Sequence, residues 1–154
     1  MKLWVDADAC PTAVKELLYK AVKRTGVRMT LVANTSVRVP KSELIDVITV
    51  GTGMNIADRK IVELVEAGDL VITADIPLAA DVVAKGALAL DPRGELYSDA
   101  NVGRRVAMRN LFDDLRGEGH TVRGPAGFTP QNRQKFANEL DRWLAKLPKP
   151  PKAE

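Results

Sequence analysis

Two aspartates, Asp6 and Asp8, follow directly on the short apolar run Leu3–Val5. A continuous apolar run of this kind is typical of a strand covered on both faces in a parallel sheet, and such sheets bind ligands at the carboxyl ends of their strands. Side chains two positions apart in an extended segment point to the same side, so we expect both carboxylates to face one cation or one substrate. Pro11 predicts a helix start, and capping that helix is the alternative role for Asp8.

A second junction of this kind lies in the middle of the chain, where the apolar run Leu70–Thr73 is followed by Asp75 and a helix is predicted at Pro77. Asp58 lies in the opening turn of another predicted helix. Both acids have an alternative role at a helix start, where a carboxylate stabilises the helix by about 0.3 to 1 kcal/mol. Asp6 has no such alternative, because it follows its strand directly.

Four carboxylates on one rim of a sheet cannot all stay ionised, so either some of them take up protons or a cation binds among them. The chain has one histidine and one cysteine, and therefore no cluster of nitrogen or sulfur ligands. Oxygen ligands favour Mg²⁺ or Mn²⁺ over Zn²⁺. Such an ion can activate water against a phosphodiester. We expect a metal-dependent nuclease, with the catalytic acids Asp6, Asp58 and Asp75 and with Asp8 as a further metal ligand.

Two other functions remain open from the residues alone. The Asp-x-Asp pattern also suits a phosphatase that forms an aspartyl-phosphate, with Asp6 as the nucleophile, Asp8 as the acid and base, and Thr35 and Lys60 as supporting groups. A non-catalytic nucleic-acid-binding protein is the other alternative. Nucleotide-binding signatures fail, because the glycine pair at 51 and 53 lacks the third glycine of the dinucleotide fingerprint and no phosphate-loop lysine follows it.

Predicted strands alternate with predicted helices along the chain, and these elements would position the acids. Strands are predicted at Leu3–Val5, Val27–Ala33, Leu44–Val50, Leu70–Thr73, Ala87–Leu90 and Glu95–Tyr97. Helices are predicted from Pro11 to Gly26, Asn55 to Gly68, Pro77 to Ala84, Ala100 to Arg116 and Thr129 to Leu147. This alternation predicts a three-layer α/β sandwich with a mainly parallel central sheet. Residues 1–147 are expected to form a single domain, and residues 148–154 a disordered tail.

In the helix predicted at Ala100–Arg116, the apolar stripe consists of Met108, Leu111, Phe112 and Leu115. Its extension toward the N-terminus reaches Asn101, Arg104 and Arg105, and either helix rotation leaves these groups in water or they face an anion. We expect Arg104, Arg105 and Lys60 to contact the phosphates of a nucleic acid. The net charge of +3 permits such a partner.

The composition limits the expected partners and cellular location of the protein. Aromatic residues make up 5% of the chain, which argues against a surface for stacking single-stranded bases. No apolar run approaches the roughly 20 residues that cross a bilayer, so no membrane association is expected. The single cysteine, Cys10, excludes an intramolecular disulfide, and no secretory leader precedes the first strand, so a cytoplasmic location is expected. His120, in a glycine-rich stretch, is expected to be a solvated loop residue.

The segments WVDADACP, GTGMNIADRKIVELVEAGDLVITADIPLA, LDPRGELY and NVGRRVAMRNLFDDLR resemble the YaiI/YqxD family of small bacterial proteins. The resemblance covers the chain up to about Leu147. It implies a PIN-like fold, related in shape to the PIN and NYN metal-dependent ribonucleases, and RNA rather than DNA as the partner. It carries over an acid at the end of the first strand, Asp6, and one after the ITAD strand, Asp75. Asp58 resembles a further site acid, and Asp8 is the weakest transfer.

The chain departs from the PIN pattern at one point. A typical PIN site includes a glutamate from a helix between these acids, and Glu43, Glu63 and Glu66 are the available substitutes. Asp81 or Asp99 could equally complete the set. Because of this departure, the resemblance leaves the non-catalytic PIN-like alternative open.

Overall fold

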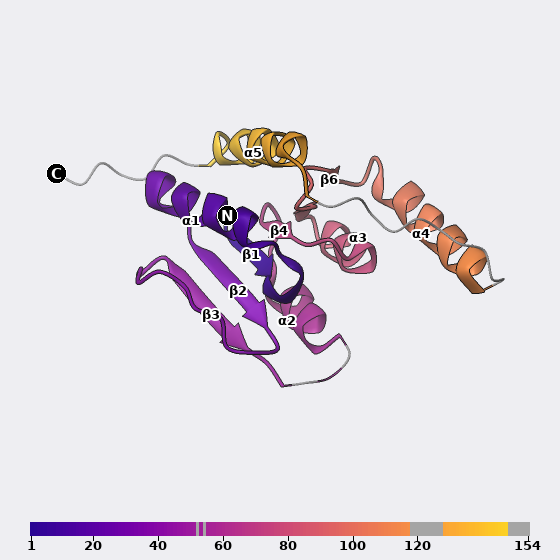
Figure 1. The fold of residues 1–154 in the computed structure, drawn as a ribbon, viewed down its shortest axis with the longest axis horizontal. Helices are drawn as coiled ribbons and strands as arrows, with labels where there is room; N and C mark the ends of the chain where they lie inside the picture. The colour runs from indigo at the N-terminus through magenta and orange to yellow at the C-terminus, as the bar shows by residue number, and fades with distance from the viewer. Residues whose placement is uncertain (52, 54, 118–127, 148–154) are drawn as a thin grey trace.

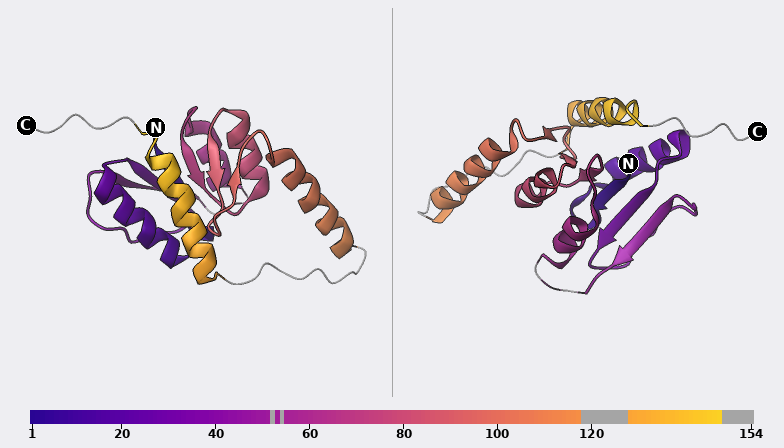
Figure 2. Two further views of the ribbon diagram at one scale, coloured as in Figure 1. Left: turned by 90° about the horizontal axis from the view of Figure 1, so that it is seen from above. Right: turned by 180° about the vertical axis from the view of Figure 1, so that it is seen from behind.

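A six-stranded sheet with helices on both faces forms the body of the protein (Figures 1 and 2). The computed structural model describes residues 1–51, 53, 55–117 and 128–147, without the side chains of residues 9 and 112–117. The strands are β1 Leu3–Asp6, β2 Met29–Ala33, β3 Ile45–Thr49, β4 Leu70–Ile72, β5 Leu88–Leu90 and β6 Leu96–Tyr97. They lie in the order β3-β2-β1-β4-β5-β6, and every pair is parallel except β5 with β6. The predicted α/β sandwich with a mainly parallel sheet is therefore confirmed.

The helices divide between the two faces of the sheet. In the described ranges they are the 3-10 turn η1 Ala7–Ala9 and the helices α1 Thr12–Thr25, α2 Ile56–Leu64, α3 Ile76–Ala84, α4 Val102–Gly117 and α5 Pro130–Leu144. Helices α1 and α5 cover one face, and α2 and α3 cover the other (Figure 1). No helix of the described part is long and apolar enough to span a bilayer.

Alternation along β1 explains why this strand is apolar throughout. Leu3 and Val5 pack with α1 and α5, whereas Trp4 packs with α2 and α3. Because side chains alternate along a strand, Asp6 continues the row of Trp4 and faces the side of α2 and α3. The last residue of the central strand is therefore an acid on the face that carries the candidate site.

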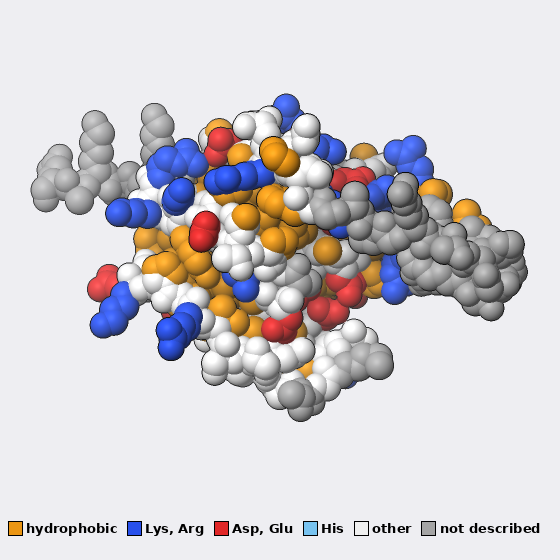
Figure 3. All heavy atoms as spheres, viewed as in Figure 1, with side chains coloured by type: hydrophobic (Ala, Val, Ile, Leu, Met, Phe, Trp, Pro, Cys, Tyr) orange, Lys and Arg blue, Asp and Glu red, His pale blue; other side chains and the backbone are white. Residues whose placement is uncertain are grey.

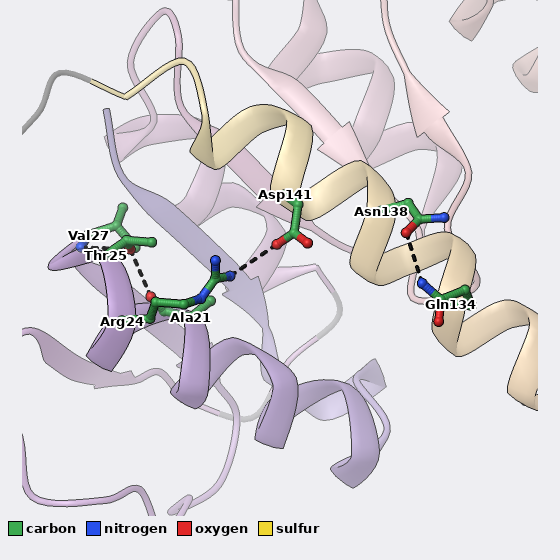
Figure 4. A network of polar contacts seen from close by, with 7 residues as sticks. All are labelled: Ala21, Arg24, Thr25, Val27, Gln134, Asn138 and Asp141. Atoms are coloured by element: carbon green, nitrogen blue, oxygen red, sulfur yellow. Dashed lines mark hydrogen bonds and ion pairs between the residues drawn. The ribbon is translucent and has the colours of Figure 1, made fainter.

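Helix α5 docks beside α1 and brings the end of the described chain back onto the sheet (Figure 2). Thr129 and Asn132 form a reciprocal capping box at its start. Phe136 and Leu140 on its inner face are buried in the core. The ion pair between Arg24 and Asp141, at 3.0 Å, is solvent-exposed (Figure 4) and contributes little, so apolar burial is what holds the helix.

Helix α2 ends at Leu64 and not at the predicted Gly68. The cause is Asp69, a buried acid whose Oδ2 accepts the Glu66 backbone N–H at 2.9 Å and thereby closes a turn in place of further helix. The same carboxylate accepts the Trp4 indole N–H at 3.0 Å and the Lys2 backbone N–H at 2.9 Å. Asp69 therefore connects the start of β1 to the start of β4. These amino ends of the strands lie at the end of the sheet opposite to the candidate site.

Helix α4 contacts α3 and extends away from the sheet (Figure 1). The side chains of Met108 and Leu111 are 40% and 51% exposed, so the part of the predicted stripe that is described does not face the core. The side chains of Phe112 and Leu115 lie outside the described part. The expectations for His120 and for a disordered tail at 148–154 also fall on residues that the structure does not describe.

Candidate functional site

The strand order reverses between β1 and β4, and this reversal sets the position of the site. The chain leaves β1 through α1 on one face of the sheet to reach β2, and it leaves β4 through α3 on the other face to reach β5. In sheets of this kind the two connections diverge and leave a crevice beyond the carboxyl ends of the strands, where ligands bind. Asp6 ends β1 at this point, and Thr73 follows β4 beside it.

A chain of hydrogen bonds fixes Asp6 and Asp75 relative to each other. Asp6 is 7% exposed, and its Oδ2 accepts the hydroxyl of Thr73 at 3.0 Å. The same Thr73 oxygen accepts the backbone N–H of Asp75 at 3.0 Å. Asp75 in turn caps α3, because its Oδ1 accepts the Leu78 N–H at 2.9 Å. The capping role considered for Asp75 is therefore real, and it holds this acid beside the end of β1.

Asp58, from the first turn of α2, faces these two acids across the crevice. Burial raises the pKa of Asp58 to about 6, and the carboxylates of Asp75 and Asp6, a hydrogen bond with Asp75, and Asp81 add to the rise. Burial also raises the pKa of Asp6, against the hydrogen bond from Thr73 that lowers it. Three of the four predicted acids thus lie within electrostatic reach of one another. Acidic side chains gather over α2 and α3 in Figure 3.

A cleft of about 520 Å³ opens beside these acids, between α2, α3 and α4. Its charged lining residues are Asp58, Arg59, Glu63, Asp75, Asp81 and Arg109. Asp81 and Glu63 are among the residues that the sequence offers to complete an acidic set. Asp99 and Glu43 are exposed in turns outside this lining, and Glu66 lies near Asp69 at the opposite end of the sheet.

Sequence reasoning missed the two arginines of the cleft. Arg59 follows Asp58 on α2, and Asn55, Asp58, Arg59 and Val62 share one side of that helix at the spacing of its turns. This spacing was a signal available in the sequence. Arg109 comes from α4, and no sequence pattern fixes which side of α4 meets the cleft. Asn55 precedes α2 with a positive φ of 63°, a conformation that Asn tolerates better than most residues.

Asp8 does not line the acidic cleft, although its charge adds to the raised pKa of Asp6. Residues Ala7–Ala9 form a 3-10 turn, so the extended geometry that would point Asp8 and Asp6 to the same side is absent, and that prediction is wrong. The exposed Asp8 carboxylate accepts the Asn34 backbone N–H at 2.8 Å and lines a different cleft. It does not cap α1 either, because Pro11 precedes that helix without a side-chain cap.

The three predicted phosphate contacts lie outside the acidic cleft. Lys60 is half-buried on α2, and Arg104 is exposed on α4. Arg105 forms an ion pair with Glu95, and its guanidinium carbon lies 6.0 Å from the centre of the Tyr97 ring. Arg105 is thus engaged with the β5–β6 hairpin, whereas Arg59 and Arg109 are the cations placed beside the acids.

Within the described ranges, no three Asp, Glu, His or Cys side chains are grouped closely enough to hold a metal ion. The donors that do face one another are all carboxylates, and this chemistry fits Mg²⁺ or Mn²⁺. The neighbouring Asp75 carboxylate adds to the rise that burial causes in the pKa of Asp58. Paired carboxylates take up a proton when no cation neutralises them.

The fold and this site define a class: an α/β protein with a mainly parallel sheet and an acidic cleft at the point where the strand order reverses. Residues 4–146 match the family described as "Uncharacterized BCR, YaiI/YqxD family", and the chain belongs to it. A UPF0178 protein of Shewanella amazonensis is 56% identical over 149 residues, which cover 97% of this chain and 100% of that protein. A UPF0178 protein of Maridesulfovibrio salexigens is 53% identical over 146 residues, 95% of this chain and 97% of the relative. No solved structure matches the chain.

Proposed function

We propose that the protein is a PIN-like, Mg²⁺- or Mn²⁺-dependent nuclease that hydrolyses phosphodiester bonds in RNA, with Asp6, Asp58 and Asp75 as its reactive acids. The observation that carries the proposal is geometric: Thr73 orders Asp6 and Asp75 at the strand ends, and Asp58 lines the same cleft as Asp75. The raised pKa of Asp58, to which the carboxylates of Asp75 and Asp6 contribute, supports it. Acids that the fold holds close together repel one another when ionised, and a bound cation would relieve this repulsion.

Each acid has a distinct part in this proposal. A bound ion would supply an activated water and neutralise charge on the phosphate. Asp6, held by the Thr73 hydroxyl, and Asp75, fixed as the cap of α3, are the pre-positioned ligands. Asp58, whose pKa is raised to about 6, would give up its proton when a cation binds. Arg59 lines the same cleft, and its guanidinium would bind an oxygen of a phosphate that enters it.

Calorimetric titration with Mn²⁺ tests the metal site, and cleavage of a labelled single-stranded RNA in the same buffer tests the chemistry. The variants Asp6→Asn and Asp75→Asn remove charge while an amide oxygen can still accept from Thr73 or cap α3. Both should lose Mn²⁺ binding and at least a hundredfold in cleavage rate, on the order of what one electrostatic group contributes to catalysis. Asp46→Asn, an exposed acid on β3, is the matched control.

Two outcomes would contradict the proposal. If Mn²⁺ binds the Asp6→Asn and Asp75→Asn variants as it binds the unaltered protein, these acids do not form the metal site. If a phosphate mimic such as fluoroberyllate becomes trapped on Asp6 and small phosphomonoesters are hydrolysed, the aspartyl-phosphate alternative takes the place of the nuclease.

A further inference from the structure

A second cleft, of about 500 Å³, lies between α1 and the loop that follows β2. Its lining is polar: Lys15 and Arg38 contribute cations, and Thr12, Tyr19, Thr35 and Ser36 contribute hydroxyls. Ammonium, guanidinium and hydroxyl groups are the donors that proteins use for phosphate oxygens. The role of this cleft is not explained by the acidic site, because the side chains that line the two clefts are different.

Among the residues that the structure describes, the two cations of this cleft have no side-chain hydrogen-bond or ion-pair partner. No hydrogen bond or ion pair joins the Lys15 or Arg38 side chain to any residue in the described part of the chain. This holds although Asp8 and Glu16 also line the cleft. Asp8 is engaged by the Asn34 N–H at 2.8 Å, and this contact ties the start of the loop to the end of β1. The cleft therefore contains two cations without an ion-pair partner among the described residues, and the contact between Asp8 and Asn34 fixes one of its sides.

The chain connects this cleft directly to the candidate site. Asp6 faces the acidic site, and Asp8, two residues later, lines the second cleft. The charges of Asp6 and Asp8 also interact, because Asp8 contributes to the raised pKa of Asp6. The turn at Ala7–Ala9 follows Asp6 directly and contributes to the lining of the second cleft, which Lys15 and Arg38 also line.

We propose that the Lys15–Arg38 cleft binds the backbone phosphates of a single-stranded RNA next to the phosphate at the acidic site. The inference rests on the proposed function for its substrate, but it concerns binding alone. Lys15 and Arg38 hold phosphate oxygens, and the surrounding hydroxyls donate further hydrogen bonds. Glu16 and Asp8 oppose the binding, since a carboxylate beside a phosphate repels it.

Fluorescence anisotropy of a short fluorescein-labelled oligouridylate tests this inference, measured with EDTA so that no hydrolysis takes place. The variants Lys15→Gln and Arg38→Gln remove charge and keep most of each side chain's length, which preserves packing at the half-buried Lys15. Each should lower the steepness of the salt dependence by about 0.7, the value for one phosphate contact on a single strand. The double variant should bind on the order of tenfold more weakly at low salt.

Controls and the opposite charge change complete the experiment. Lys20→Gln on α1 and Lys41→Gln on the loop after β2 remove exposed cations that do not line the cleft, and binding should stay within twofold. Glu16→Gln should tighten RNA binding. Far-UV circular dichroism and thermal unfolding establish that every variant is folded. If the double variant binds with the unaltered affinity and salt dependence, or if the unaltered protein binds no RNA, the inference is overturned.

Failure of this inference and failure of the proposed function give different results. RNA binding that depends on Lys15 and Arg38 in a protein that does not cleave RNA with Mn²⁺ supports the cleft and contradicts the nuclease. Cleavage that requires Asp6 and Asp75 while binding ignores Lys15 and Arg38 supports the nuclease and contradicts the cleft.

Discussion

The hydroxyl of Thr73 opposes the rise that burial causes in the pKa of Asp6. It donates to Asp6 at 3.0 Å inside the protein and is the contact that lowers the Asp6 pKa against burial. The same oxygen accepts the Asp75 N–H, so one atom orders both acids. No sequence pattern predicts that a threonine after a buried strand will hydrogen-bond to both acids.

Replacing Thr73 by Val should therefore raise the pKa of Asp6 further and destabilise the fold. The loss of a donor to a buried carboxylate costs about 1 to 3 kcal/mol of unfolding free energy. Urea denaturation gives the stability, and carboxyl carbon NMR titration gives the pKa. Thr73→Ser should restore both, and Thr30→Val, at another buried strand threonine with no side-chain hydrogen bond among the described residues, should be nearly neutral. Equal losses at both sites would contradict a specific role for Thr73.

The raised pKa of Asp58 makes stability depend on pH in a defined window. The folded protein holds this proton more tightly than the unfolded chain, since the pKa rises from the usual 3.8 to about 6. The stabilisation is therefore complete below pH 3.8 and is lost as pH rises through 6. Asp58→Asn should remove this dependence and raise the unfolding temperature relative to the unaltered protein at pH 8 more than at pH 4. Parallel pH profiles for the two proteins would contradict this.

The element that carries each acid or arginine decides whether its position could be predicted from the sequence. Asp6 and Asp75 were predictable because each follows an apolar strand, and the end of a strand in a parallel sheet has one possible location. Asp8 was misplaced because a single 3-10 turn rotates its side chain out of the row of Asp6. Arg109 depends on how α4 lies against α3, and long-range packing of this kind leaves no trace in a local pattern.

Gly94 shows how the elements constrain each other. It has a φ of +95°, and a Cβ at this position would lie 2.6 Å from the backbone nitrogen of Phe136 in α5. Gly94→Ala should cost about 1 kcal/mol for the backbone conformation and about 1 to 3 kcal/mol more for the displaced helix. Gly26→Ala, at a φ of +77° with open space around it, should cost only the first amount. Chemical denaturation measures both, and equal costs would show that α5 yields freely.

At the scale of the whole molecule, the sequence predicted the layers because each strand and helix has a strong local pattern. The strand order β3-β2-β1-β4-β5-β6 could not be predicted from local patterns, because it depends on the face of the sheet that each crossover connection covers. That order is what brings Asp6 beside Thr73 and Asp75, residues separated by more than sixty positions. The site exists only in the folded sheet, so a cation that bound there, as proposed, would be coupled to folding of the sheet.

This coupling predicts that Mn²⁺ protects the protein against heat. An ion that binds only the folded state, at a hundred times its dissociation constant, adds about 2.7 kcal/mol, and a domain of this size gains roughly 5 to 10 °C. Differential scanning calorimetry at pH 7.5 should record this shift for the unaltered protein and for Asp8→Asn, whose carboxylate faces the other cleft. Asp6→Asn and Asp75→Asn should lose it. A shift that disappears in Asp8→Asn and persists in Asp75→Asn would place the ion at the second cleft and contradict the acidic site derived from the strand order.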